Sequence, residues 1–360
     1  MSKKEYIIPI FIPFLGCPHD CAFCNQVKIT NYKDNINKEN TIRQINQYLS
    51  YFPKNENLKE IAFFGGSFTG LDEKVMISYL EIALNYKKKG IIDRIRLSTR
   101  PDYINNSILD ILKEKSVDVI ELGIQSLDQD ILDYNERGHT VVDSYKASEL
   151  IKKYDFTLGH QIMPGLFKDE HQKSIKTAID SANMNPNMVR IYPTLVIKDT
   201  KLEALYNLGV YKPLNVEEAV NLSAELYMIY RAKDIDVIRI GLQTTENIND
   251  KADVVAGPFH PAIRQLTESF VYRKYLEELI EREKIDRDFT IHTDNRSISI
   301  IAGNKKSNKK YFYQKYGINL SFEADKSDFI SLEDRKIELN LDGFIYSYVK
   351  ETYGGDLILD

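Results

Sequence analysis

The chain has 360 residues and a formal net charge of −5, with 43% hydrophobic and 28% charged residues. This composition excludes a disordered chain and a polycation, and it suggests about two folded domains. The N-terminal apolar run is short, and no stretch of about 18 apolar residues occurs, so we expect neither a signal peptide nor a membrane span. Three cysteines cannot make a disulfide framework and favour the reducing cytoplasm.

Residues 1–245 alternate between short apolar runs and amphipathic stretches. Seven runs are predicted to be strands: Tyr6–Phe14, Glu60–Phe64, Ile92–Ser98, Val117–Ile124, Thr157–Met163, Met188–Val196 and Val237–Leu242. Segments of helical period lie between them: Asn40–Tyr51, Glu73–Tyr86, Asn106–Glu114, Val142–Tyr154, Gln172–Met184 and Val216–Ala232. Parallel strands need helical crossovers, so this order predicts an α/β fold, a partial (βα)6-type barrel whose site lies in the loops after the strands.

The pattern changes after residue 245. We expect a linker and long helix over 246–285 and a small α+β domain over 286–360. The elements expected after residue 245 are a helix at Arg264–Glu283, a strand at Ser297–Ile301, a helix at Ser307–Tyr316, a strand at Gly317–Glu323, and alternating runs at Lys336–Leu341 and Gly343–Lys350.

The three cysteines follow the first predicted strand in the spacing CxxxCxxC, as Cys17, Cys21 and Cys24. Thiolates are soft ligands that suit iron–sulfur clusters or zinc. Three ligands leave an open metal position, which is typical of catalytic rather than structural sites. The alternative is structural zinc with His19 as a fourth ligand. Zinc ligands usually come as two separated pairs, and the sequence has no second pair, so an iron–sulfur cluster is favoured.

CxxxCxxC after the first strand of a βα-repeat protein resembles the radical S-adenosylmethionine (SAM) superfamily. The resemblance implies that three cysteines hold a 4Fe–4S cluster and that SAM chelates the fourth iron. It also implies that one electron, from a donor such as flavodoxin or ferredoxin, cleaves SAM to methionine and a 5′-deoxyadenosyl radical. The turn with Gly65, Gly66 and Ser67 stands where the superfamily has a glycine turn that contacts SAM.

Later segments resemble the Elongator catalytic subunit and its bacterial relatives: Leu97–Asp102, Glu121–Ser126, Asn135–Thr140, His160–Gly165 and Arg190–Leu195. The resemblance implies that Gln125 and Arg137 hold the SAM ribose and carboxylate, and that Ser98 to Arg100 flank the adenosyl group. A surface cation at Arg137 and a turn-capping role for Gln125 are the alternatives. We expect no acetyltransferase domain, because the chain is too short after residue 245 to contain one.

The segment from Gly303 to Gly317 contains five lysines and no acidic residue. Its glycine loop resembles that of KH RNA-binding domains, which clamps a nucleic-acid backbone between helices, although Lys306 replaces the usual second glycine. The resemblance implies RNA contacts from Gly303, Lys305, Lys306, Lys309 and Lys310. A lysine-rich solvated helix is the alternative.

These patterns predict a cytoplasmic radical SAM enzyme that modifies a base in tRNA or ribosomal RNA. Radical chemistry on a small molecule, as in coproporphyrinogen oxidase, and a non-catalytic iron–sulfur adaptor for RNA remain open as alternatives. His139 and His160 are expected to be structural rather than metal ligands. Tyr192 is expected in the core with a hydrogen-bonded hydroxyl.

Overall fold

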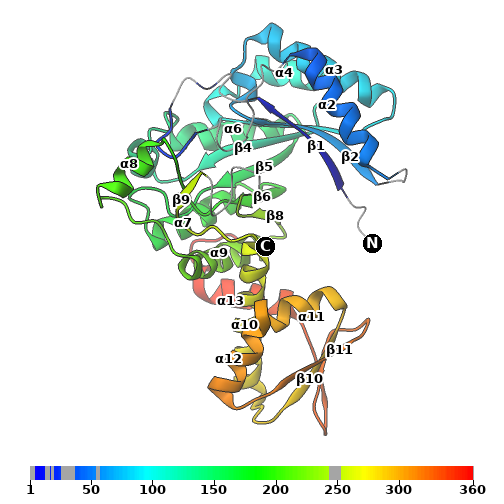
Figure 1. Ribbon diagram of the computed structural model, residues 1–360, viewed down its shortest axis with the longest axis vertical. Coiled ribbons are helices and arrows are strands. Elements are labelled where there is room, and N and C mark those ends of the chain that lie inside the picture. The colour runs from blue at the N-terminus through cyan, green and yellow to red at the C-terminus, as the bar shows by residue number, and fades with distance from the viewer. Residues whose placement is uncertain are drawn as a thin grey trace.

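The computed structural model describes residues 5–12, 17, 20–25, 37–53, 57–242 and 253–359. A parallel sheet with its helices forms the larger part, and a small sheet domain lies beyond the long helix α10 (Ile263–Glu283) (Figure 1). No helix among the described residues is long and apolar enough to cross a membrane.

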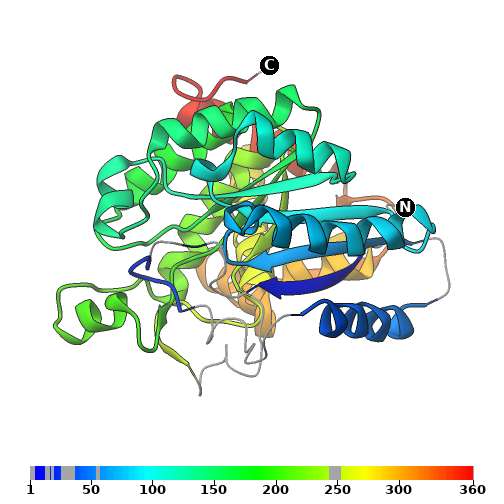
Figure 2. The ribbon, with the colours of Figure 1, turned by 90° about the horizontal axis from the view of Figure 1, so that it is seen from above.

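The main sheet has seven strands in the order β1-β2-β3-β4-β5-β6-β8, and every neighbouring pair is parallel. Its strands are β1 (Glu5–Ile12), β2 (Leu58–Gly65), β3 (Arg94–Thr99), β4 (Val119–Gln125), β5 (Thr157–Ile162), β6 (Met188–Ile191) and β8 (Asp236–Ile240). The sheet curls into an open half-barrel with helices along its outer face (Figure 2). The predicted partial barrel is therefore confirmed.

The covering helices are α2 (Lys38–Tyr51), α3 (Glu73–Lys88), α4 (Asn106–Glu114), α5 (Gln129–Tyr134), α6 (Val141–Lys153), α7 (His171–Asn183), α8 (Lys201–Asn207) and α9 (Val216–Arg231). Most of these helices start after a residue whose side chain caps the first turn, whereas α7, preceded by Glu170, has no side-chain cap. Asn37, Asp72 and Asn105 each accept a first-turn N–H, which stabilises the helix start by about 1 kcal/mol. Isoleucine and leucine on the convex side of the strands pack beneath these helices and form the main core.

Strand β6 is shorter than the predicted run Met188–Val196, because it stops at Ile191, two residues before Pro193. Proline has no N–H to donate to a ladder, so the strand ends there. The remainder, β7 (Val196–Ile197), pairs antiparallel with β9 (Val254–Ala256) outside the barrel.

The small sheet has the strand order β11-β10-β12-β13 and lies beyond the long helix predicted at Arg264–Glu283. Its elements are β10 (Phe289–Thr293), α11 (Asn295–Ala302), α12 (Ser307–Tyr316), β11 (Leu320–Ala324), β12 (Phe329–Ser331) and β13 (Lys336–Glu338). The final helix, α13 (Leu341–Tyr353), packs its buried residues Phe344, Ile345 and Val349 into the main core.

Two predicted elements of this region are wrong. Ser297–Ile301 lies in helix α11 rather than in a strand, because Asp294 caps the N–H groups of Arg296 and Ser297. Gly343–Lys350 lies in helix α13, which Asn340 caps through the N–H of Gly343. In both cases an Asp or Asn cap outweighs the β-branched and aromatic residues that follow it.

Candidate functional site

The cysteine segment follows β1 at the carboxyl edge of the sheet. The backbone N–H of Ala22 donates to Asn135 O at 3.0 Å, and Leu202 N–H donates to Ala22 O at 2.7 Å. Phe23, 8% exposed, packs in an apolar cluster with Leu166, Leu202 and Tyr211. The segment is thus fixed to the connections that follow β4 and β6. His19, the alternative zinc ligand, lies outside the described residues.

The thiols lie among cations. Cys21 is 7% exposed, and Arg137 Nη1 lies 3.5 Å from its sulfur. Burial raises the pKa of Cys17, while the positive charge of Arg137 and a hydrogen bond from the Ser67 backbone lower it. Across the described ranges, no three His, Cys, Asp or Glu side chains are arranged to hold a metal ion. The structure therefore places Cys17 and Cys21 near one arginine.

The glycine turn at the end of β2 is shaped by β1. Gly65 has φ +107°, and a Cβ there would lie 2.9 Å from Ile12 O. Gly66 N–H donates to the same oxygen at 2.9 Å. Contact with β1 is therefore by itself a sufficient reason for glycine at position 65. Gly66 remains as the glycine that could approach a ligand.

Ser67 joins the glycine turn to the end of β3. Its buried hydroxyl lies 2.8 Å from Thr99 Oγ1 and accepts from the Arg100 N–H at 3.3 Å. Since these contacts and the Cys17 contact use its polar groups, Ser67 links the turn, the first cysteine and the third strand. A role in holding this corner together fits its contacts.

Buried polar atoms without partners gather beside the cysteine segment. Arg100 is 2% exposed and pairs with both Asp102 oxygens at 2.9 Å, but its Nη1 has no partner among the described residues. Arg137 is 7% exposed and donates through Nη2 to Gly123 O at 2.7 Å, while its Nε has none. Arg137 is therefore not a surface cation. Orphaned buried donors are rare and indicate a position for a ligand or ion.

Gln125 and His139 extend this set. Gln125 has φ +63°, a conformation that costs a non-glycine residue energy and clusters at functional sites, and its buried Oε1 is unpartnered. Both ring nitrogens of His139 also lack a hydrogen-bond partner within the described ranges. Burial, and then the charges of Arg137 and Arg100, lower the pKa of His139 to about 3, so the ring is neutral. The sequence predicts a structural His139 with hydrogen-bonded ring nitrogens, whereas neither nitrogen has a partner among the described residues.

Gly123 explains how two of these residues come together. A Cβ at this position would lie 2.8 Å from Gln125 Nε2 and 2.9 Å from Arg137 Nη2. A larger residue here would displace one or both of these side chains at the end of β4. The predicted pair Gln125 and Arg137 is therefore brought to one point, next to Cys21.

The concave face of the half-barrel carries a buried charge network that sequence reasoning missed. Arg96 donates to Glu60 at 2.6 and 3.1 Å and to Glu121 at 2.6 Å. Arg190 donates to both Glu121 oxygens at 2.6 and 2.9 Å. Together these donors hold the pKa of Glu121 at about 2, against the opposing effect of its burial. The signal in the sequence is a charge at alternate positions of otherwise apolar strands, which places the charges on one face.

Ser98 belongs to this face. Gln161 Nε2 donates to Ser98 Oγ at 3.3 Å and to Glu121 Oε2 at 2.9 Å. Tyr192 is half-buried and hydrogen bonds with Arg190, in line with the bonded hydroxyl expected of it. Ser98 therefore lies one layer deeper than Arg100. It stands between the charge network and the carboxyl edge of the sheet with Cys17 and Cys21, which we call the cysteine edge.

His160 is a satisfied structural residue, as expected. It is fully buried, and its two ring nitrogens lie 3.0 Å from Ser148 Oγ and 2.8 Å from Ser181 Oγ. In the small domain, Gly303 ends α11, and Lys305, Lys306, Lys309 and Lys310 lie on the loop after it and on α12, apart from the cysteine edge. Lys315 pairs with Glu277.

Comparison with known proteins identifies two family models along the chain. Residues 11–179 match the model of the radical SAM superfamily, and residues 186–273 match that of the radical SAM C-terminal domain. Together the matched ranges run from β1 into α10 and include all residues of the cysteine edge described above.

Three relatives were compared in sequence. The chain is 34% identical to a tRNA uridine(34) acetyltransferase of Methanocaldococcus jannaschii over 129 residues, which cover 35% of this chain and 24% of that protein. It is 30% identical to the uncharacterized protein MJ0486 of that organism over 235 residues, covering 61% and 70%. It is 30% identical to Elongator complex protein 3 of Saccharomyces cerevisiae over 135 residues, covering 37% and 24%. The match thus spans about a quarter of the two functionally named relatives.

Among solved structures, the archaeal Methanocaldococcus infernus Elp3 with an N-terminal deletion has a TM-score of 0.56 to this chain at 17% identity. The superposition covers 92% of this chain and 74% of that one. This likeness supports the fold, and the sequence matches support the Elongator-like resemblance.

Proposed function

Because the chain belongs to the radical SAM superfamily, we propose that it cleaves SAM at a 4Fe–4S cluster and uses the resulting radical to modify a base in tRNA or ribosomal RNA. The observation that carries the proposal is the CxxxCxxC segment at the carboxyl edge of a seven-stranded parallel half-barrel, inside the matched range 11–179. The reaction belongs in a reducing cytoplasm, because the ligands must remain thiolates.

Cys17, Cys21 and Cys24 are the proposed cluster ligands. When bound, such a cluster supplies the electron, received from a donor such as flavodoxin or ferredoxin, that cleaves SAM to methionine and a 5′-deoxyadenosyl radical. The donor set fits, since three thiols bind soft metals and leave one site open. Arg137, 3.5 Å from the Cys21 sulfur, would offset part of the negative charge of the thiolates.

SAM is proposed to lie against Gly66, Arg100, Gln125 and Arg137. The support is the set of buried atoms without partners: Arg100 Nη1, Gln125 Oε1 and Arg137 Nε. Arg137 would hold the SAM carboxylate, to which a guanidinium can donate two hydrogen bonds. Gln125 would bind the ribose, and Ser98 and Arg100 would flank the adenosyl group. Ser67 would act on this site through its contacts with Cys17 and Thr99.

An RNA base is the proposed target. It is supported by the names of two relatives, tRNA uridine(34) acetyltransferase and Elongator complex protein 3, and by the lysine-rich loop of the small domain. The enzyme superfamily favours turnover over a non-catalytic adaptor. Radical chemistry on a small molecule is the other alternative, and the nucleoside measurement below distinguishes it from RNA modification.

The test combines two measurements. Anaerobically reconstituted protein with SAM and a reductant should release 5′-deoxyadenosine, followed by liquid chromatography. Mass spectrometry of nucleosides from the RNA of a deletion strain should show one modified nucleoside lost relative to the parent. Release of 5′-deoxyadenosine with an unchanged nucleoside profile would favour a small-molecule substrate. No release under any reducing condition would contradict the enzymatic proposal itself.

A further inference from the structure

The loop between α11 and α12 carries unpaired positive charge. In the described part of the chain, no acidic side chain forms an ion pair with four of the five lysines: Lys305, Lys306, Lys309 and Lys310. Lys315 differs, because Glu277 accepts its ammonium group. The chain as a whole has a net charge of −5, so this local excess of cations stands against the general charge. Cations of one sign gathered on a loop and on the helical turn after it raise the local positive potential, which favours an anionic partner.

The loop holds a defined shape. Gly303 has φ +79°, and a Cβ there would collide with the Ser307 hydroxyl and lie 2.9 Å from Asn308 N. Lys305 and Lys306 follow with φ +51° and +61°. Two consecutive left-handed lysines are costly, so the surrounding structure must impose this conformation.

Asn308 fixes the start of α12, which directly follows the loop. This fully buried side chain donates to Ser269 O and Ile301 O, both at 2.9 Å, and accepts from Arg273 Nε at 3.0 Å. It therefore ties the start of α12 to α10 and α11. The Arg273 guanidinium also places a positive charge next to the start of α12. A ligand that binds here would lose little free energy to ordering the loop.

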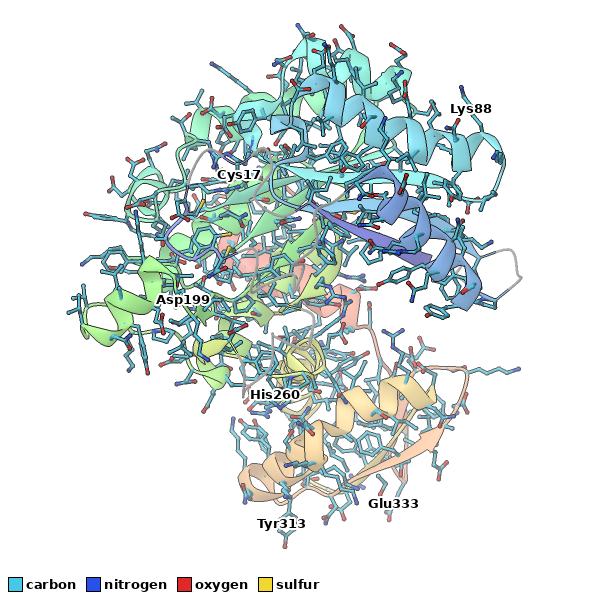
Figure 3. All side chains as sticks on the ribbon, turned by 45° about the horizontal axis from the view of Figure 1, so that its top comes forward. Cys17, Lys88, Asp199, His260, Tyr313 and Glu333 are labelled. Carbon is cyan, nitrogen blue, oxygen red and sulfur yellow. The ribbon has the colours of Figure 1, made fainter. Side chains whose placement is uncertain are left out.

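An exposed aromatic ring lies beside these lysines. Tyr313 is 60% exposed. It follows Lys306 by seven residues, and Lys309 and Lys310 by four and three, so these side chains lie along one side of α12. Figure 3 shows Tyr313 directed away from the small domain at its far end. Cations interleaved with an exposed aromatic ring are typical of surfaces that bind single-stranded nucleic acid, where bases stack on the ring.

The position of this surface selects the kind of ligand. Tyr313 lies in the small domain, whereas Cys17 lies in the half-barrel at the other side of α10 (Figure 3). A small molecule could not contact both. A polymer with regularly spaced phosphates could occupy the lysine loop while one of its bases enters the half-barrel.

We infer that the loop Gly303–Lys306 and the exposed face of α12 bind the phosphate backbone of a single-stranded RNA segment, with Tyr313 stacking on one of its bases. The inference deepens the proposed function, and it rests on that function for the choice of RNA. The lysines supply sequence-independent affinity, and Asn308 acts as the positioning residue of the loop.

The test is RNA binding by the full chain, measured as fluorescence anisotropy of a labelled tRNA transcript over a series of salt concentrations. The quadruple variant Lys305→Gln, Lys306→Gln, Lys309→Gln and Lys310→Gln should lower the slope of log K against log salt by about 3, at about 0.7 for each single-strand phosphate contact. The matched control replaces four exposed lysines of other helices by glutamine: Lys74, Lys88, Lys89 and Lys146. It makes the same change in net charge and should keep the slope.

A second pair of variants tests stacking. Tyr313→Ala should weaken binding by roughly fivefold or more, as a lost base–aromatic stack does, with little change of salt slope. Tyr145→Ala removes a ring that is 43% exposed on α6 and serves as the control. Thermal melting of each variant checks folding, and the double variant Lys305→Gln, Lys306→Gln replaces the quadruple one if that melts early.

Equal salt slopes in the two quadruple variants would overturn the inference. So would equal affinity for a phospholipid vesicle or an acidic peptide that competes with the RNA. The RNA-binding result can be interpreted independently of the proposed function, because RNA binding requires no SAM cleavage. Failure of the unaltered chain to release 5′-deoxyadenosine would count against the proposed function and would leave the binding result standing.

Discussion

At the scale of single residues, the three cysteines carry the first prediction. Changing Cys17, Cys21 or Cys24 to alanine should each abolish the iron–sulfur absorbance after anaerobic reconstitution, because the chain has no other cysteine to take the place of a lost ligand. Iron and sulfide assays should fall from about four of each per chain to near zero. Ala22→Ser, within the same segment, is the matched control. Tightly bound zinc without iron in the unaltered protein would speak against the cluster.

Arg137 carries the second prediction. Its guanidinium is buried, bonded to Gly123 O and free at Nε, so a carboxylate placed there would gain a charge-assisted pair. Arg137→Ala should weaken SAM binding by about 1.5–3 kcal/mol, measured by calorimetric titration. Arg94→Ala removes a half-exposed arginine paired with Glu5 and should leave the affinity unchanged. Equal SAM affinity in both variants would remove Arg137 from the site.

The buried charge network gives a prediction of pH dependence. The pKa of Glu121 is lowered from 4.5 to about 2, so its carboxylate stabilises the fold above pH 4.5, and that contribution is lost as the pH falls through about 2. The contribution amounts to about 3 kcal/mol. In denaturant titrations, the difference between the unaltered chain and Glu121→Gln should shrink by this amount over that range. Glu149→Gln, on an exposed i,i+4 pair, should leave the free energy of unfolding nearly unchanged over the same pH range.

At the scale of elements, the junction of β1 and β2 sets the shape of the cysteine edge. Gly65→Ala should destabilise the fold by about 2 kcal/mol or more, because it adds a Cβ next to Ile12 O at a left-handed φ. Gly90 also has a positive φ, +66°, but open space around it, so Gly90→Ala should cost only about 1 kcal/mol. Comparable losses in urea titration would mean that conformation, not the contact with β1, decides the effect.

Much of the element order could be predicted from the sequence, since apolar runs and caps report directly on strands and helix starts. The seven parallel strands and the long helix were predicted on that basis. Helix α11 was missed because Ile298, Ile300 and Ile301 suggest a strand, while the deciding signal was the single cap Asp294. Local caps can thus override a short β-branched run.

The site was predictable only in part. Spacing and resemblance predict Cys17, Cys21, Gln125 and Arg137. The close packing of Gln125 and Arg137 around Gly123, which has no Cβ, is visible only in three dimensions. The pairing of Arg96 and Arg190 with Glu121 joins three strands, so no single segment reveals it. The ion pair of Lys315 with Glu277 is likewise a contact between distant segments, so the sequence does not show which of the five lysines is paired.

At the scale of the whole molecule, the cysteine edge lies in the half-barrel, and the lysine loop Gly303–Lys306 lies in the small domain. Helix α10 joins these two parts (Figure 1). If both proposals hold, a substrate must be long enough to touch both parts. A full-length RNA should therefore be modified with a much higher kcat/KM than a short stem-loop or a nucleoside carrying the same target base. The advantage should shrink at high salt, because it derives from phosphate contacts.

Rate measurements can distinguish the contribution of the small domain from that of the half-barrel. Single-turnover modification of the full-length RNA and of the short stem-loop at saturating concentration should approach the same rate, since the lysine loop contributes affinity and not chemistry. The variant with four glutamines at Lys305, Lys306, Lys309 and Lys310 should lose the preference for the long RNA by a rise in KM. The control with Lys74, Lys88, Lys89 and Lys146 replaced should retain it. A nucleoside that is modified as efficiently as the full RNA would show that the small domain does not hold the substrate.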